Sequence, residues 1–182
     1  LIRTKMPEGH AGSAEWLDSR ESGSGAATKL MPFAGISFLW FIGVIRDGLG
    51  RYEDKFFSSV FLGSGLLFLA MMFVSTSVAA GLVASNGQVA DAAAHAATVD
   101  FGKMVVLAAS KTYAVRMAAV FMMSLATIWL RTGLMPRWLV GLSYLAAIGV
   151  LVASDLSMWI TLVFPVWVLV VSGLLLVRAG LF

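Results

Sequence analysis

Two basic side chains interrupt a long apolar stretch of this chain. Lys111 and Arg116 stand in the sequence Ala-Ser-Lys-Thr-Tyr-Ala-Val-Arg, with Tyr113 between them. A charge at bilayer depth is costly, so such residues usually pair, face a cavity or reach toward the lipid headgroups. Asp155, in a short connection later in the chain, is an acidic partner for Arg116. We therefore predict an Arg116–Asp155 ion pair, or snorkelling of the cation. The alternative is a substrate-anion or lipid-headgroup site made by Lys111, Tyr113 and Arg116.

Other residue types that carry chemistry are sparse. The chain has no cysteine and two histidines, His10 and His95, which both lie outside the apolar stretches, in segments predicted to be extracytoplasmic. A haem held by a helical bundle needs axial ligands, usually histidines, inside the helices, and a hydrolytic site needs a nucleophile beside a base. The sequence contains neither arrangement. We therefore expect no catalytic residue, no metal site and no cofactor, and hence a chain that is not an enzyme.

The composition predicts the class of protein that positions these residues. The chain has 182 residues, of which 59% are hydrophobic and 13% charged, whereas a soluble domain carries about 25% charged residues. Its basic residues collect at the ends of the apolar stretches rather than on one face, so the net charge of +3 does not indicate nucleic-acid binding. The prediction is an all-α, polytopic transmembrane helical bundle.

Five apolar stretches are long enough to cross a hydrocarbon core of about 30 Å. They predict spans at about 30–45, 56–84, 104–130, 138–153 and 158–177, with the bundle occupying 30–182. Pro32 falls in the first turn of the first span, where a missing N–H costs little. The Ala-rich stretch 88–99 extends the second or third helix beyond the bilayer. Residues 1–29 are rich in Gly, Ser and Ala and predict a polar extracytoplasmic segment.

The distribution of lysine and arginine predicts the orientation, because these residues favour cytoplasmic loops. Alternate connections and the C-terminal end hold six basic residues, and these fall on one side: Arg46, Arg51, Lys55, Arg131, Arg137 and Arg178. That side is predicted to be cytoplasmic, with the C-terminus inside and residues 1–29 outside. The chain begins with Leu1 rather than Met, and two interpretations stay open: a sixth, upstream span, or a processed terminus.

Small residues and one proline predict how the helices pack. Ser77, Gly81 and Ser85 repeat at a spacing of four, which permits close helix approach. Pro165 interrupts the last span and frees the carbonyl of Thr161. A packing kink is the first interpretation of this proline, and a hinge or binding-site break is the second.

Several sequence blocks resemble an uncharacterised actinobacterial family of multi-pass membrane proteins. The clearest is Arg131-Thr-Gly-Leu-Met-Pro-Arg-Trp-Leu, a helix–turn–helix pattern found in several bacterial membrane families of unknown function. Further blocks begin at Pro32, Phe61, Arg116 and Phe164, so the resemblance covers most of the chain from residue 30 onward. It implies a location in the bacterial cytoplasmic (inner) membrane and implies no activity.

Two hypotheses for function follow from these patterns. The first is an accessory or scaffold subunit of a larger membrane complex, without catalysis, whose partners are the lipid bilayer and other membrane subunits or further copies of itself. The second is a small transporter or a lipid- or anion-binding membrane protein that uses the basic site at Lys111, Tyr113 and Arg116.

Overall fold

A computed structural model describes residues 21–49, 55–85, 92–153 and 162–178 of the chain. Over these residues the backbone is helical apart from short turns, and no strand is present. Three helical runs are long and apolar enough to cross a membrane by length and composition: 29–48, 55–84 and 93–132. Two shorter apolar helices complete the described part of the chain. The predicted all-α helical architecture is therefore confirmed.

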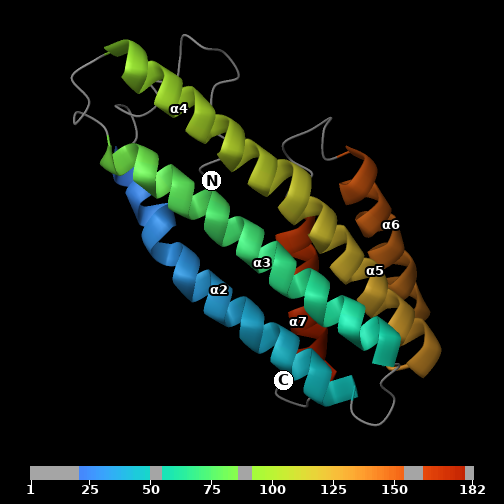
Figure 1. The fold of residues 1–182 in the computed structure, drawn as a ribbon. Helices are drawn as coiled ribbons and strands as arrows, with labels where there is room; N and C mark the ends of the chain where they lie inside the picture. The colour runs from blue at the N-terminus through green and yellow to red at the C-terminus, as the bar shows by residue number, and fades with distance from the viewer. Residues whose placement is uncertain (1–20, 50–54, 86–91, 154–161, 179–182) are drawn as a thin grey trace.

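Figure 1 shows the helices in chain order from α2 to α7. A single helical run is made of α4, a π-helical segment η4 and α5 without a break. The bounds are α2 Glu21–Leu49, α3 Lys55–Ala84, α4 Ala92–Leu107, η4 Ala108–Ala114, α5 Val115–Thr132, α6 Arg137–Ala153 and α7 Val163–Arg178.

Two helices start earlier in the chain than the apolar pattern indicated. α2 begins at Glu21, so residues 21–29 are helical rather than a loop, and Pro32 lies inside the helix instead of in its first turn. The run that contains α4 begins at Ala92, which shows that the Ala-rich stretch extends the third predicted helix. The extension that begins at Ala92 is rich in alanine, the residue with the highest helix propensity, whereas residues 21–29 contain two alanines among glycine and serine. Residues 1–20 of the predicted polar segment lie outside the described residues.

The α4–η4–α5 run is the central helix of the bundle. About 61% of its most apolar window is buried, against 28% for α2 and 22% for α3. α3 and α6 both pack against α5, and α2 packs against α3. Small side chains on α5, including Ala118, Ala119 and Ala126, are fully or almost fully buried. They allow the neighbouring helices to approach closely, which is how helices gain packing energy inside a bilayer.

An aromatic cluster fills the centre of the bundle where α2, α3, α5 and α7 meet. Phe121 of α5 lies at its middle, with ring centroids 4.5 Å from Phe61 and 5.4 Å from Phe38. Phe164 and Trp167 of α7 pack on the same ring at 5.9 and 6.2 Å. These centroid distances are those of favourable offset and edge-to-face aromatic pairs. The cluster therefore holds four helices together at one level of the bundle.

Glycine permits the closest approach at this level. A Cβ atom on Gly65 of α3 would lie 2.9 Å from the side chains of both Ile42 and Phe121. Such a distance is shorter than carbon–carbon contact, so the three helices meet here only because position 65 lacks a side chain.

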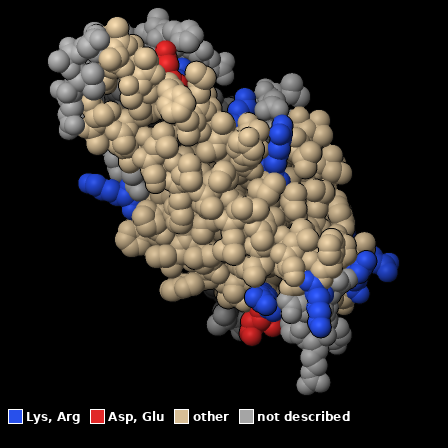
Figure 2. Space-filling view, in the orientation of Figure 1, with Lys and Arg blue, Asp and Glu red and all other residues tan. Residues whose placement is uncertain are grey.

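The outer surface of the bundle is as apolar as its core. Large apolar side chains are exposed on every described helix, among them Phe33, Trp40, Phe73, Leu145 and Leu169. Figure 2 shows this surface as a broad uncharged area, with Lys and Arg atoms grouped at the lower end and further ones at the upper right and on the left side. A soluble monomer rarely exposes apolar patches of more than a few hundred Å². The surface is therefore compatible with a lipid environment.

One end of the bundle extends beyond α6 and α7, and the start of α2 lies beside α3 there. In Figure 1 α4 and the second half of α3 run beyond the ends of α6 and α7. They pack on each other through a small cluster of Ala79, Val99 and Val106. A Cβ on Gly102 would lie 2.6 Å from Leu82 Cδ2, so the two helices are in close contact. We call this part of the molecule, residues 75–84 and 92–107, the helical arm.

Candidate functional site at the π-helical segment

The π-helical segment η4 begins beside a polar contact between two helices. The hydroxyls of Ser75 on α3 and Ser110 on η4 both donate to the carbonyl oxygen of Val106, at 3.2 and 2.7 Å. Both serines are buried. A π-helical turn shifts the backbone hydrogen-bonding register and is often found at functional sites. The two serine hydroxyls therefore donate to the carbonyl of Val106, which lies just before the start of η4 at Ala108.

The basic residues predicted to do chemistry lie on and next to this segment. Lys111 is half-buried, and among the described residues it makes no hydrogen bond or ion pair. Tyr113 is 58% exposed, and Arg116, in the first turn of α5, is also exposed and engaged in an interaction. The structure thus brings Lys111, Tyr113 and Arg116 to neighbouring turns of one helix.

The fourth member of the predicted site, Asp155, lies outside the described residues. The helix register nevertheless places the end of α6 near Arg116. Tyr144 of α6 is hydrogen-bonded to Thr127 of α5 at 2.6 Å, and the two helices are antiparallel. Counting nine residues along each helix from that bond brings Ala153 to the level of Ala118. The Arg116–Asp155 ion pair stays a prediction, and this register is compatible with it.

Two further polar contacts join helices inside the bundle. The Trp167 indole N–H donates to Ser143 Oγ at 2.8 Å, and that hydroxyl donates to the carbonyl of Leu139. Thr127 Oγ1 donates to the carbonyl of Met123, so in the contact with Tyr144 the phenol must be the donor. Each hydroxyl in these contacts donates one hydrogen bond, and the contacts Trp167–Ser143 and Tyr144–Thr127 each join two helices.

The residues predicted to govern packing are placed as follows. Ser77 and Gly81 of α3 are exposed on the helical arm, and nothing lies within 4 Å of a Cβ built on Gly81. Ser85, just after α3, is half-buried and bonds to the carbonyl of Leu82. The stripe therefore does not mediate a contact between described helices.

Pro165 is the third residue of α7 and is exposed, so it sits in a first turn, where proline is tolerated. Thr161 lies outside the described residues.

Within the described ranges, no three His, Asp or Glu side chains come together as metal ligands do. Comparison of the chain with protein-family models, with curated proteins and with solved structures gives no match. The resemblance to an actinobacterial membrane-protein family accordingly stays a prediction.

The sequence patterns did not identify the π-helical turn or the Ser75–Val106–Ser110 contact. A usable signal was present, because Ser75 and Ser110 are polar residues within stretches that are otherwise apolar. Hydroxyls at such positions seek a carbonyl on their own helix or on a neighbour. The choice between these two partners depends on the lateral position of the helices, which a sequence pattern does not contain.

Proposed function

We propose that this chain is an integral membrane accessory or scaffold subunit, without catalysis of its own, that docks onto a larger complex through the helical arm. In this proposal the arginine-bearing end faces the cytoplasm of a bacterium, and the helical arm lies on the outer side of the membrane. The observation that supports it is the position of Phe101, an exposed aromatic side chain. Phe101 lies beyond the apolar, lipid-facing part of the bundle surface, which we call the apolar belt.

The belt is measured along α3. Large exposed apolar residues on this helix run from Phe56 to Val74. The stretch from Lys55 to Val74 rises about 28 Å at 1.5 Å per residue, which matches a hydrocarbon core of about 30 Å. Beyond Val74 the exposed positions of α3 carry small or polar residues, including Ser77 and Gly81. The lipid-facing surface of this helix therefore ends near Val74.

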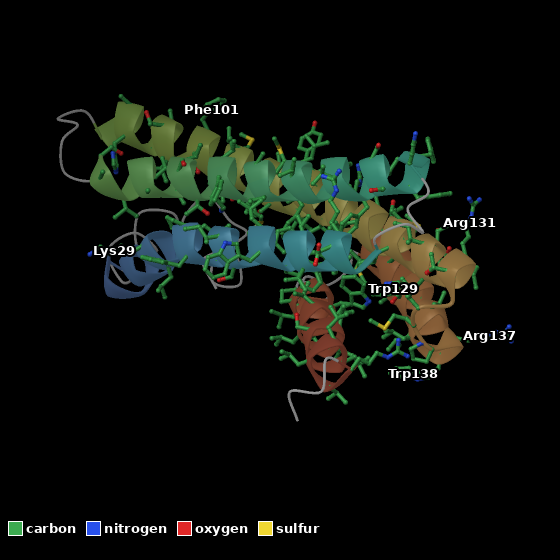
Figure 3. All side chains as sticks on the ribbon, turned by 90° about the horizontal axis from the view of Figure 1, so that it is seen from below. Lys29, Phe101, Trp129, Arg131, Arg137 and Trp138 are labelled. Carbon is green, nitrogen blue, oxygen red and sulfur yellow. The ribbon has the colours of Figure 1, made fainter. Side chains whose placement is uncertain are left out.

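Phe101 of α4 lies beyond that limit. Its neighbour Gly102 packs against Leu82, which is about 12 Å further along α3 than Val74. Phe101 is 68% exposed, and in Figure 3 it lies toward the end of the molecule opposite Arg131 and Arg137. Met104, one turn later, is 63% exposed. Apolar side chains that stand outside the belt favour a protein contact, because aromatic residues and methionine are enriched in interfaces.

The packed centre of the bundle supports a structural function over transport. The rings of Phe38, Phe61, Phe121 and Phe164 fill the level at which α2, α3, α5 and α7 meet. A transporter places its substrate site near the middle of the membrane, between broken helices. The aromatic cluster occupies that level with side chains instead.

The test replaces Phe101 with alanine and uses Phe56→Ala as the matched control. Phe56 on α3 has the same residue type and nearly the same exposure, 67% against 68%, but belongs to the apolar belt. The tagged chain is purified from native membranes in mild detergent, and its complex is weighed by native mass spectrometry. We expect a complex of fixed stoichiometry that Phe101→Ala weakens by at least tenfold, since truncating an interface aromatic costs about 2 kcal/mol or more. A monomeric chain, or equal effects of both substitutions, would overturn the proposal.

The half-buried Lys111 favours a second candidate function, the binding of an anion or lipid headgroup at the π-helical segment. Lys103, on the same helical run, is also half-buried and serves as the control. If this function holds, Lys111→Gln lowers the affinity for an anionic lipid in detergent while Lys103→Gln does not. Equal affinities for both variants would exclude it.

A further inference from the structure

The buried side of the α4–η4–α5 run follows a regular heptad series with one extra residue. Its members, each at most 4% exposed, are Val99, Val106, Ala114, Phe121 and Ile128. Successive members are seven residues apart, except that Val106 and Ala114 are eight apart. The longer spacing spans η4, which occupies Ala108–Ala114. A π-helical turn holds about one residue more than an α-helical turn, so η4 accounts for the extra residue.

The extra residue brings the exposed side of η4 into line with the exposed side of α4. Tyr113 stands seven residues after Val106, so in an unbroken α-helix it would lie on the buried side. It is instead 58% exposed, and Ala114 takes the buried position. Tyr113 follows the exposed Ala108 at five residues, about one π-helical turn. The exposed side therefore continues from the helical arm into the bundle.

We call the residues of this continuous exposed side the outward face. They are Ala97, Phe101, Met104, Ala108 and Tyr113. The first four repeat at spacings of four, three and four residues, which is the contact pattern of two helices that cross at about 20°. Phe101 and Met104 are the large members, and the small side chains of Ala97 and Ala108 leave room for the side chains of a second helix.

The outward face crosses the outer edge of the apolar belt. The carbonyl of Val106 accepts a hydrogen bond from Ser75, which directly follows Val74 at the end of the belt. Phe101 lies about 8 Å outside this edge, and Tyr113 lies about 10 Å inside it. Lipid covers only the inner part of such a face, and a partner in water covers only the outer part. A helix that crosses the membrane and continues beyond it covers both.

Two polar side chains inside the belt indicate the chemistry of that helix. Neither the half-buried Lys111 nor the Tyr113 hydroxyl makes a hydrogen bond or ion pair with a described residue. Helices α3, α5 and α6 and the η4 segment contain no Asp or Glu. A cation at this depth favours an acidic partner, and a hydroxyl there favours an acceptor on a neighbouring helix. One carboxylate on the second helix supplies both.

We propose that the outward face binds a transmembrane helix of a partner subunit. This helix continues beyond the outer surface of the membrane along α4, and it carries a carboxylate opposite Lys111 and Tyr113. The inference rests on the proposed function, because the partner must dock on the helical arm. It adds that the same helix extends along η4 into the apolar belt.

The experiment maps the partner by photo-cross-linking in native membranes. The photoreactive residue p-benzoylphenylalanine replaces Phe101, Ala108 or Tyr113 in the full chain, and cross-linked peptides are identified by mass spectrometry. We expect all three positions to reach one continuous segment of one protein. The sites reached from 101 and 113 should be about 12 residues apart, because both helices rise about 1.5 Å per residue. An Asp or Glu should lie within one turn of the site reached from 113. As the control, Leu145 in the middle of α6, 71% exposed, should not reach this segment.

Paired alanine substitutions test the face itself. Ala97→Trp and Ala108→Trp should each weaken the native complex at least tenfold, because the indole fills space that the partner occupies. The matched controls are Ala96→Trp and Ala70→Trp, which should each change it less than twofold. Ala96 is exposed about 140° around α4 from Phe101, and Ala70 is exposed on α3 inside the belt.

The charge is tested at Lys111. Lys111→Gln should weaken the complex at least fivefold, and Lys111→Arg should retain it, because arginine keeps the cation. Equal losses in the two variants would overturn the predicted carboxylate contact.

Other outcomes would overturn the proposed helix. Cross-linking of Tyr113 to lipid alone, while Phe101 still reaches a protein, would refute it and leave the proposed function standing. Links from the two positions to different proteins, or to separate segments, would also refute it. Equal effects of Ala108→Trp and Ala70→Trp would refute the contact inside the belt. If no position reaches a protein, both this inference and the proposed function fail.

Discussion

The hydrogen bond between Trp167 and Ser143 provides a sharp test of how α6 and α7 are held together. Trp167 is 4% exposed and Ser143 is fully buried, and the indole N–H donates to Ser143 Oγ at 2.8 Å. Ser143→Ala removes this acceptor and leaves the indole N–H without it in an apolar core. An unsatisfied buried donor costs about 1–3 kcal/mol, whereas hydrogen bonds between membrane helices average about 0.6 and reach about 1.7 kcal/mol. We therefore expect a loss of about 1–2 kcal/mol.

Ser124 of α5 supplies a closely matched control. It is 5% exposed, and its hydroxyl donates to the carbonyl of Val120 at 2.8 Å, four residues back, just as Ser143 donates to Leu139 at 2.8 Å. Ser124→Ala therefore removes the same hydroxyl, the same volume and the same local bond. The two serines differ in the additional bond from Trp167. The difference between the two variants isolates the contribution of the contact between helices.

The measurement is the free energy of unfolding in mixed micelles, titrated with a denaturing detergent and followed by circular dichroism. Ser143→Ala should lose about 1 kcal/mol more than Ser124→Ala. A double-mutant cycle with Trp167→Phe should give a coupling energy of at least about 0.5 kcal/mol. If the two serine variants agree within about 0.3 kcal/mol, the bond contributes nothing measurable and the reasoning is refuted.

Two further predictions concern close packing and topology. Gly65→Ala should destabilise the bundle by about 1–3 kcal/mol in the same unfolding assay, because its Cβ would lie 2.9 Å from Ile42 and Phe121. Gly63→Ala, where nothing lies within 4 Å, should be neutral, and equal losses would refute the packing argument. Cysteines substituted at Ser22 and Ser85 should react with an impermeant reagent in intact cells, while one at Gly180 should react only after permeabilisation. The reverse pattern would contradict the proposed orientation.

Local features of the chain made the helices predictable. Composition and the length of each apolar stretch indicate helices without any knowledge of neighbours, because a helix satisfies its backbone hydrogen bonds within one segment. The turn around Gly133 was predictable for the same reason, since a left-handed glycine after a helix and a proline before the next are local signals. The predicted start of the first helix was wrong. Residues 21–29 are polar and suggest a loop, but in the structure they form the first turns of α2.

The lateral arrangement of the helices was beyond the reach of the sequence pattern. In a soluble protein, apolar periodicity identifies the buried face of a helix. Here the exterior is apolar too, so Phe33 and Phe61 look alike in sequence although one is 67% exposed and the other is fully buried. Glycine gave the same ambiguity. Gly81 belongs to a regular small-residue stripe and contacts no described neighbour, whereas Gly65 lies where three helices meet.

The sequence alone determined that this chain forms apolar helices with cations concentrated at particular helix ends, because length, composition and charge are properties of single segments. Only the tertiary structure decided which polar groups meet. Ser124 and Ser143 stand in similar apolar surroundings in the sequence, yet Ser143 alone accepts the Trp167 N–H. Arg178 reaches Leu134 across 44 residues. Such contacts depend on how each helix is rotated about its axis relative to its neighbours. Because the surroundings of the bundle are as apolar as its core, side-chain packing and not the hydrophobic pattern determines that rotation.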